Sequence, residues 1–272
     1  MTRQMLLALC ACFLCAVSAC AGDTRTKILL IGKDRDHAYA THTYMDDCEL
    51  LARCLRQTPG LETVVSNGWP KHPEVLKDVS AIVLQTKLGG TMLLGGPQRR
   101  QVEDLMRKGV GLTAIHWSTG AEKSEGEEYL HMLGGWFNTD FSEYHVQQSK
   151  VRQADSKHPI SRGWQDFDLR EEYYIKLRYL PESKPIMKAA VKDKSGQTHD
   201  YDIAWVYERP GGGRSFGFVG GHFHANFGEK AFRQAVVNGI LWTAKREVPE
   251  DGAPCAITPK DMELAPDAPK KK

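Results

Sequence analysis

The stretch Lys27-Ile-Leu-Leu-Ile-Gly32 decides the fold, because it is a continuous apolar run that ends in glycine. Such a run is typical of a strand that is buried on both faces of a sheet. The pattern repeats at Val79 to Leu84 and at Val110 to Ile115, and Leu61 to Val65 is a shorter run. Strands of this kind need helices above and below them, so the sequence predicts an α/β protein.

Helical patterns lie between these strands. From about Tyr44 to Gln57, apolar residues recur at spacings of three and four. A second helix is expected from Pro97 to Gly109, with proline inside its start and glycine past its end. The alternation predicts an open, doubly wound, mostly parallel sheet with helices on both faces.

The pattern changes after Gly135, where strands are expected at 143–153, 186–191 and 203–207. Pro210-Gly-Gly-Gly213 is typical of a hairpin turn that returns into a strand at 215–219, which would add an antiparallel hairpin to the sheet.

A long helix from about Glu229 to Lys245 closes the expected domain, which spans residues 26–246. From Glu247 onward Pro, Asp and Lys dominate, and no apolar period survives. We therefore expect residues 247–272 to form a Pro- and Lys-rich tail.

The composition is that of an ordinary globular protein. The chain has 272 residues, of which 41% are hydrophobic and 26% are charged, and its formal net charge is +2. No clustered Lys and Arg face is apparent, so no nucleic-acid partner is expected. The oligomeric state is left open, and a homo-oligomer is one option.

Residues 1–21 have the pattern of a secretory signal peptide, with a basic start, an apolar run and small residues at the end. The run is too short to span a membrane as a helix. Two cleavage patterns compete. Val17-Ser-Ala-Cys20 resembles a lipobox that would leave Cys20 acylated, and Ala19-Cys-Ala21 fits ordinary release. The sequence therefore predicts export to a periplasmic or extracellular location, with membrane contact only through a lipid anchor at Cys20.

Polar side chains gather where the predicted strands end. Ligands of open α/β sheets bind outside the carboxyl ends of the strands. Six of the ten histidines map near this edge, as do one tyrosine and one tryptophan, and these residues are the candidates for binding substrate or metal: His37, His42, Tyr44, His116, Trp117, His145, His222 and His224.

The segment His222-Phe-His224 is a candidate metal-binding pair. On an extended strand the two imidazoles face the same side and can hold one ion, with a third ligand from His37 or His116. Zinc favours three protein ligands and an open position in catalytic sites. If the chain turns here instead, the two side chains diverge, and both alternatives stay open.

Several catalytic motifs are absent from the sequence. It contains no G-x-G-x-x-G after a strand, no Walker A, no H-E-x-x-H and no G-x-S-x-G. The turn after the strand at 110–115 carries His116 and no cysteine, so thiol acyl transfer is excluded there. The chain is not expected to be a glutamine amidotransferase.

Three ordered segments resemble the ThuA-like (trehalose utilisation) family over residues 26 to 245. They are Gly109-Val-Gly-Leu-Thr-Ala-Ile-His116, then His158-Pro-Ile-Ser-Arg-Gly163 with Phe167-Asp-Leu-Arg-Glu-Glu172-Tyr173, and then Ala204-Trp205 through Gly221-His222 to Asn238-Gly-Ile-Leu-Trp242. The resemblance implies a class I glutamine amidotransferase-like, flavodoxin-like fold. It also implies a role in carbohydrate metabolism, notably with 3-keto sugars.

The resemblance implies His116, Glu172 and His222 as catalytic residues, with Tyr173 beside them at the substrate. A 3-keto group acidifies the adjacent C–H bonds, so Glu172 as base and an electrophile would suffice for isomerisation, elimination or hydrolysis. The electrophile is a histidine or a divalent metal, with zinc favoured. Glu171 is equally consistent with a solvated and with a functional residue.

Three hypotheses follow for the function. The first is an exported enzyme acting on a sugar or 3-keto-glycoside. The second is a non-catalytic carbohydrate-binding or scaffold protein, because a fold does not imply a function. The third and weaker one is a metal-dependent hydrolase of a non-sugar substrate.

Overall fold

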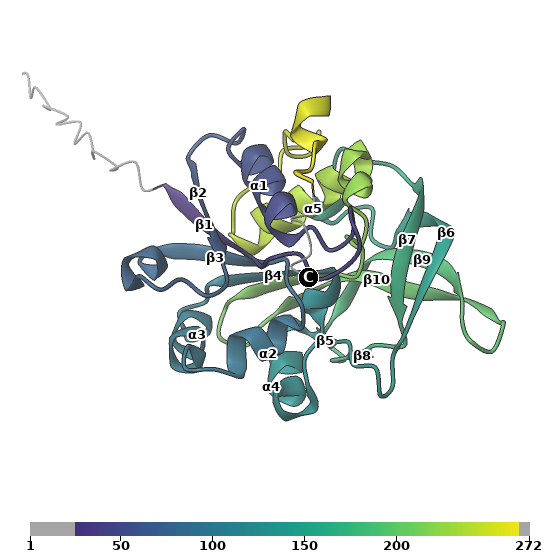
Figure 1. The fold of residues 1–272 in the computed structure, drawn as a ribbon, viewed down its shortest axis with the longest axis horizontal. Helices are drawn as coiled ribbons and strands as arrows, with labels where there is room; N and C mark the ends of the chain where they lie inside the picture. Colours follow the sequence, from purple (N-terminus) through teal and green to yellow (C-terminus); the bar gives the residue numbers. More distant parts are fainter. Residues whose placement is uncertain (1–24, 267–272) are drawn as a thin grey trace, which may run out of the picture.

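The computed structural model describes residues 25–266, which fold around one nine-stranded mixed sheet (Figure 1). The strand order is β2-β1-β3-β4-β11-β10-β9-β6-β7. The predicted signal peptide and Cys20 lie outside the described residues. Within residues 25–266 no helix has the length and apolar character needed to cross a membrane.

Five parallel strands form the first part of the sheet, and they confirm the apolar runs that the sequence indicated. Ile28 to Ile31, in the first of them, are completely buried. The five strands are β1 (Thr26–Gly32), β2 (Leu61–Asn67), β3 (Val79–Leu84), β4 (Gly111–Ile115) and β11 (Arg214–Phe218).

Helices cover both faces of these strands, as the alternating pattern predicted. In Figure 1, α1 (Tyr44–Leu55) and α5 (Lys230–Thr243) lie above the sheet. The helices α2 (Gly89–Leu94), α3 (Arg99–Arg107) and α4 (Lys123–Leu133) lie below it. The doubly wound α/β architecture is therefore confirmed.

The antiparallel part of the sheet is larger than the single hairpin that we expected. It has four strands, β10 (Thr198–Glu208), β9 (Lys184–Lys192), β6 (Glu143–Gln153) and β7 (Phe167–Ile175). β7 is the last strand of this extension, and its Glu171 carboxylate accepts a hydrogen bond from the Gly221 amide, which places β7 beside the chain that follows β11. A separate two-stranded sheet pairs β5 (Gly135–Trp136) with β8 (Arg178–Tyr179).

Short 3-10 helices lie in four of the connections and in the segment after α5. They are η1 (Pro73–Leu76), η2 (His116–Thr119), η3 (Pro159–Ser161), η4 (His224–Gly228) and η5 (Pro259–Met262).

The expected C-terminal tail is a packed part of the domain over residues 248–255. Val248, Ala253 and Cys255 are buried, and the Arg233 guanidinium donates a hydrogen bond to the Cys255 carbonyl at 2.7 Å. The segment has no helical or strand period because it forms neither element, so sequence periodicity could not reveal its packing. Cys255 is a free thiol, as are the buried Cys48 and Cys54.

Replacing Val248 with alanine is expected to lower the free energy of unfolding by about 1–3 kcal/mol, because buried methyl groups are lost and a cavity remains. The matched control is Glu250→Ala, an exposed change two residues away, with an expected effect within about 0.5 kcal/mol. Urea unfolding measures both. Equal, negligible effects would show that the segment does not pack on the domain.

Candidate functional site

Three histidines meet where parallel strands end. His42 lies in the loop after β1, His116 directly follows β4, and His222 follows β11. The Nε2 atom of His42 is 2.9 Å from Nδ1 of His222 and 3.1 Å from Nε2 of His116. The third side of the triangle, from His116 Nε2 to His222 Nδ1, is 3.2 Å. These three histidines therefore meet at the carboxyl edge of the sheet, where the sequence placed them.

Glu172 of β7 adds a carboxylate to the three imidazoles. Its Oε2 atom is 3.1 Å from His222 Nδ1 and 3.5 Å from His116 Nε2. The ligand atoms of His42, His116, Glu172 and His222 all lie within 4.8 Å of one another, and we call these residues the four-ligand cluster. Tetrahedral zinc ligands at about 2.05 Å from the ion are about 3.4 Å apart, close to the spacings of this cluster.

Hydrogen bonds on the far side of two rings decide where their lone pairs point. The Nδ1 atom of His116 is 2.8 Å from the Val219 carbonyl, which can only accept, so Nδ1 carries a proton, and in the neutral ring Nε2 then carries a lone pair. The Nδ1 atom of His42 is 2.8 Å from the Tyr44 hydroxyl, which itself bonds to the Asp36 carboxylate. Tyr44 therefore donates to Asp36 and accepts from His42, which leaves a lone pair on Nε2 of His42 as well.

The backbone is strained at two members of the cluster. His42 has φ 48° and His116 has φ 54°, both in the left-handed region that few residues other than glycine adopt. Strain of this kind persists where the surrounding structure enforces it, and it clusters at functional sites. At His42 one restraint on the backbone is a hydrogen bond from its amide to the His222 carbonyl at 3.0 Å.

Glu171 supports the loop that carries His222, and it is fully buried. Its carboxylate accepts hydrogen bonds from the Gly221 amide at 2.8 Å, the His222 amide at 3.2 Å and the Asn226 side chain at 2.8 Å. Burial raises the pKa of Glu171. The interpretation of Glu171 as a solvated residue is therefore wrong.

Gly221 is required at this turn. Its φ is 115°, and an added Cβ would lie 2.9 Å from the Ile115 side chain. Glycine thus lets the backbone pass close to β4 on its way to His222.

His224 does not belong to the four-ligand cluster. Its Nδ1 atom lies 2.7 Å from Asp47 Oδ1, and η4 begins at His224, so the chain turns and the side chains of His222 and His224 diverge. Burial alone would lower the pKa of His224, but the hydrogen bond and charge of Asp47 raise it. The predicted chelation of one ion by His222 and His224 is therefore wrong.

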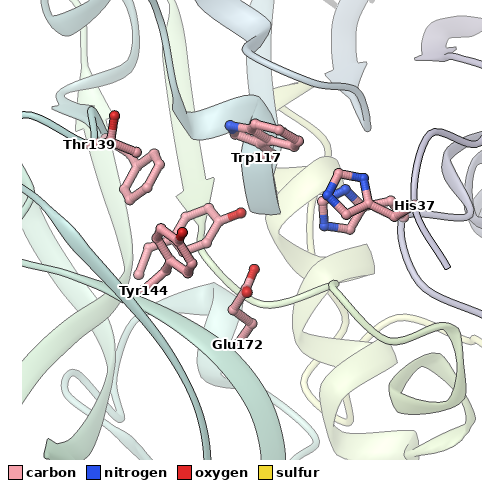
Figure 2. A pocket seen from close by; sticks show the side chains of 8 residues that line it. His37, Trp117, Thr139, Tyr144 and Glu172 are labelled. Atoms are coloured by element: carbon pink, nitrogen blue, oxygen red, sulfur yellow. The ribbon is translucent and has the colours of Figure 1, made fainter. Parts of the chain in front are cut away.

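A cavity of about 180 Å³ adjoins the cluster. In Figure 2, His37 lies on one side of it, Thr139 and Tyr144 on the other, and Glu172 between them. The lining is mostly aromatic and is formed by His37, His42, Trp117, Phe137, Thr139, Tyr144, Glu172 and Tyr174.

His37 lines this cavity but lies outside the four-ligand cluster. Its ring packs at a tilt against that of His42, with centroids 3.8 Å apart, and its Nδ1 atom is 2.7 Å from Asp36 Oδ1. Asp36, His37 and His42 form a second group of closely spaced ligand atoms, but Asp36 and His37 are solvent-facing. His42, predicted to bind substrate, is thus a member of the four-ligand cluster, and His37, predicted as a metal ligand, is not.

His145 and Tyr173 lie away from the cavity, which corrects their predicted place at the substrate. They are paired across β6 and β7, on the opposite face to Tyr144 and Tyr174. The His145 Nε2 atom is 2.9 Å from Glu143, and the Tyr173 hydroxyl donates to the Leu169 carbonyl at 2.8 Å.

Tyr174 is the main site residue that sequence reasoning missed. Its hydroxyl is 3.0 Å from His116 Nε2, and its ring stacks on the His116 ring. Strand alternation could have indicated Tyr174 as a site residue, because it is two residues from Glu172 and lies on the same face of the strand. No such pattern in the sequence indicated that Phe137, Thr139 and Tyr144 line the cavity.

The surroundings of the cluster shift the pKa values of His42 and Glu172. Burial and the neighbouring imidazoles lower the pKa of His42 to about 2, so this ring is neutral at physiological pH. Burial alone would raise the pKa of Glu172, but hydrogen bonds with His116 and His222 bring it below its usual value. Neutral imidazoles and an ionised carboxylate are the forms that bind metal.

Comparison with known proteins agrees with the resemblance in the sequence. Two solved structures have the same fold. The first is a putative ThuA-like protein from Parabacteroides merdae, with a TM-score of 0.62 and 16% identity over 89% of this chain and 100% of that chain. The second is a putative ThuA-like protein from Bacteroides uniformis, with a TM-score of 0.61 and 18% identity over 84% of this chain and 94% of that chain. A cytoplasmic protein from Salmonella typhimurium is similar too (TM-score 0.56, 16% identity, 80% and 99% covered).

No curated protein sequence is significantly similar to the chain. The ThuA family model, described as trehalose utilisation, matches residues 27–243, which is most of the chain. The chain therefore belongs to the ThuA (trehalose utilisation) family, a family of carbohydrate utilisation.

Proposed function

We propose that the chain is a zinc-dependent enzyme that acts on a sugar or 3-keto-glycoside by isomerisation, elimination or hydrolysis. One observation carries the metal: three ring nitrogens and a carboxylate oxygen, with spacings of 2.9 to 3.5 Å, converge on one point. Atoms of this kind repel one another unless a proton or a metal ion lies between them, and one metal ion would satisfy all four at once. Histidines whose far nitrogens bond to a carbonyl or to a carboxylate-linked hydroxyl are typical of metal sites.

The donor set favours zinc. Imidazole nitrogen and carboxylate oxygen suit this ion, and the spacings fit a tetrahedron. Four protein ligands fill a tetrahedral site, so a zinc ion held here would supply Lewis-acid polarisation to a substrate oxygen beside the cavity by taking that oxygen as a fifth ligand.

Glu172 belongs to the four-ligand cluster and also lines the cavity. Its lowered pKa keeps the carboxylate ionised, which is the form that a metal ligand needs. The same low pKa makes Glu172 a weak base, because an efficient general base has a pKa near the working pH. We assign Glu172 to the ligand set. We assign the base role, which the sequence suggested for Glu172, to His37, because Asp36 holds its Nδ1 proton and frees Nε2.

The aromatic lining supports a sugar as substrate. Trp117 and Tyr144 line the cavity with aromatic rings that can pack on the C–H face of a sugar ring, while Thr139 and Glu172 offer partners to its hydroxyl groups. The family's description points to the same class of substrate. Export through residues 1–21, with release or lipid attachment at Cys20, remains part of this proposal.

Glu171→Gln is expected to weaken zinc binding by about 10- to 100-fold although all four ligands remain, because this carboxylate orients the His222 loop. Chelator competition measures the affinity. Asp168→Asn, an exposed change on the same strand, is the matched control and should leave the affinity unchanged. An unchanged affinity in Glu171→Gln would show that Glu171 does not position His222.

Turnover by chelator-treated and zinc-reconstituted protein tests the function. The probes are glucose and trehalose, each also as its 3-keto derivative, with products followed by mass spectrometry. We expect conversion of at least one probe by the zinc-loaded protein and none without metal. Binding without any conversion would favour a carbohydrate-binding protein, and conversion of equal rate without metal would contradict the zinc role.

A further inference from the structure

We propose that Tyr174 is a further catalytic residue, whose hydroxyl donates a hydrogen bond to the substrate oxygen that gains negative charge during the reaction. This inference rests on the proposed function, because it assigns one more group to the reaction at the same cavity. The position of the hydroxyl beside the ligand atoms and the packing that fixes its ring support this role.

The Tyr174 hydroxyl lies where the four-ligand cluster borders the cavity. It is 3.0 Å from the Nε2 atom of His116, and it also hydrogen-bonds to Glu172. Two members of the cluster, His42 and Glu172, line the cavity, and Tyr174 lines it with them. A substrate oxygen that approaches the cluster from the cavity therefore arrives beside the Tyr174 hydroxyl.

Aromatic packing holds the Tyr174 side chain in place. Its ring stacks on the His116 ring, with centroids 4.6 Å apart, and on the Phe137 ring, with centroids 4.1 Å apart. Tyr174 is also buried, with 3% of its surface exposed. A donor that is fixed before the reaction needs no reorganisation when charge develops beside it, and such a donor stabilises a transition state most effectively.

The hydroxyl has a proton to offer to the substrate. A phenol is protonated at neutral pH and donates to one acceptor at a time. The His116 Nε2 lone pair belongs to the proposed ligand set, so it is no longer an acceptor in the zinc-loaded protein. The hydroxyl can then donate to the Glu172 carboxylate or to an oxygen that enters from the cavity.

The chemistry of a 3-keto sugar places negative charge on such an oxygen. When His37 Nε2 accepts the proton of the carbon next to the keto group, the C–H bond breaks and its electron pair moves toward the keto oxygen, which becomes an enolate oxygen. An enolate oxygen accepts a stronger hydrogen bond than a neutral carbonyl does. The Tyr174 hydroxyl therefore stabilises the transition state more than the bound substrate.

Tyr174→Phe tests this inference, because it removes the hydroxyl and keeps the ring. Zinc affinity, measured by chelator competition, should stay close to the wild-type value. In calorimetry, the zinc-loaded protein should bind acetohydroxamate, an anion that offers zinc a charged oxygen, about tenfold or more weakly than the wild type. With the glucose or trehalose probe that is converted, kcat should fall about 100-fold while KM changes little.

Tyr173→Phe is the matched control, since it removes the hydroxyl of the neighbouring tyrosine. That hydroxyl is also buried, and it donates to the Leu169 carbonyl at 2.8 Å, away from the cavity. The control variant should keep the wild-type zinc affinity, acetohydroxamate affinity and kcat. Urea unfolding of both variants shows whether each one is folded.

The outcomes separate the two proposals. If folded Tyr174→Phe keeps the wild-type acetohydroxamate affinity and kcat, this inference is wrong and the proposed function stands. If Tyr174→Phe loses zinc affinity about tenfold or more, the hydroxyl orients the Glu172 ligand, and the inference is again wrong. If the wild type converts no probe, the proposed sugar reaction fails, and weaker acetohydroxamate binding by Tyr174→Phe would still support the hydroxyl as donor. If the wild type binds no zinc, both proposals fail.

Discussion

His116→Ala is expected to weaken zinc binding by more than about 100-fold, which exceeds the usual cost of losing a partner outside the ligand set. The reason is geometric. His116 Nε2 lies 3.1 Å from the ligand nitrogen of His42 and 3.2 Å from that of His222, and the Val219 carbonyl aims it at them. Zinc titration against a competing chelator measures the loss.

The matched control for this prediction is His145→Ala, which removes a histidine outside the cluster and should keep wild-type zinc affinity. His116→Asn guards against misfolding, since asparagine tolerates the left-handed backbone found at this position. It too should lose zinc affinity. Wild-type affinity in a folded His116 variant would remove this residue from the ligand set.

Asp47→Ala is expected to lower the free energy of unfolding by about 3–5 kcal/mol, the usual cost of breaking a buried pair by removing one partner. Asp47 is completely buried and accepts hydrogen bonds from Thr43 at 2.9 Å and Gln85 at 3.2 Å, besides its contact with His224. Without the carboxylate, all three side chains lose a buried partner. Urea denaturation at neutral pH measures the change.

Asp46→Asn is the matched control for Asp47→Ala, because it removes the neighbouring carboxylate from a partly exposed pair with Arg35. Its expected cost is about 1 kcal/mol or less. Similar costs for the two variants would show that the buried pair does not support α1 and the His224 turn.

The parallel half of the fold was predictable because strands buried on both faces keep their signal in the sequence. Ile28 to Ile31 is an unbroken apolar run, Val79 to Leu84 is apolar apart from Ser80, and each forms a strand where expected. The antiparallel extension was only partly predictable, since its strand order depends on pairings between residues far apart, such as β6 with β9.

The site could be predicted to the level of the sheet edge and no further. His37 and His42 follow the same strand, and His42 reaches His222 because the chain there pairs with the segment after β11, through the bridge between Thr41 and Phe223. The divergence of His222 and His224 depends in the same way on a turn, which begins at His224. Contacts between distant segments set both outcomes, and a single sequence does not display them.

The metal content of the protein, produced without a histidine tag and incubated with zinc, tests the central claim most directly. Elemental analysis should find about one zinc per chain in the wild type and less than about 0.1 in His116→Ala, as expected for one site built from four side chains. Less than about 0.1 zinc per chain in the reconstituted wild type would contradict the account.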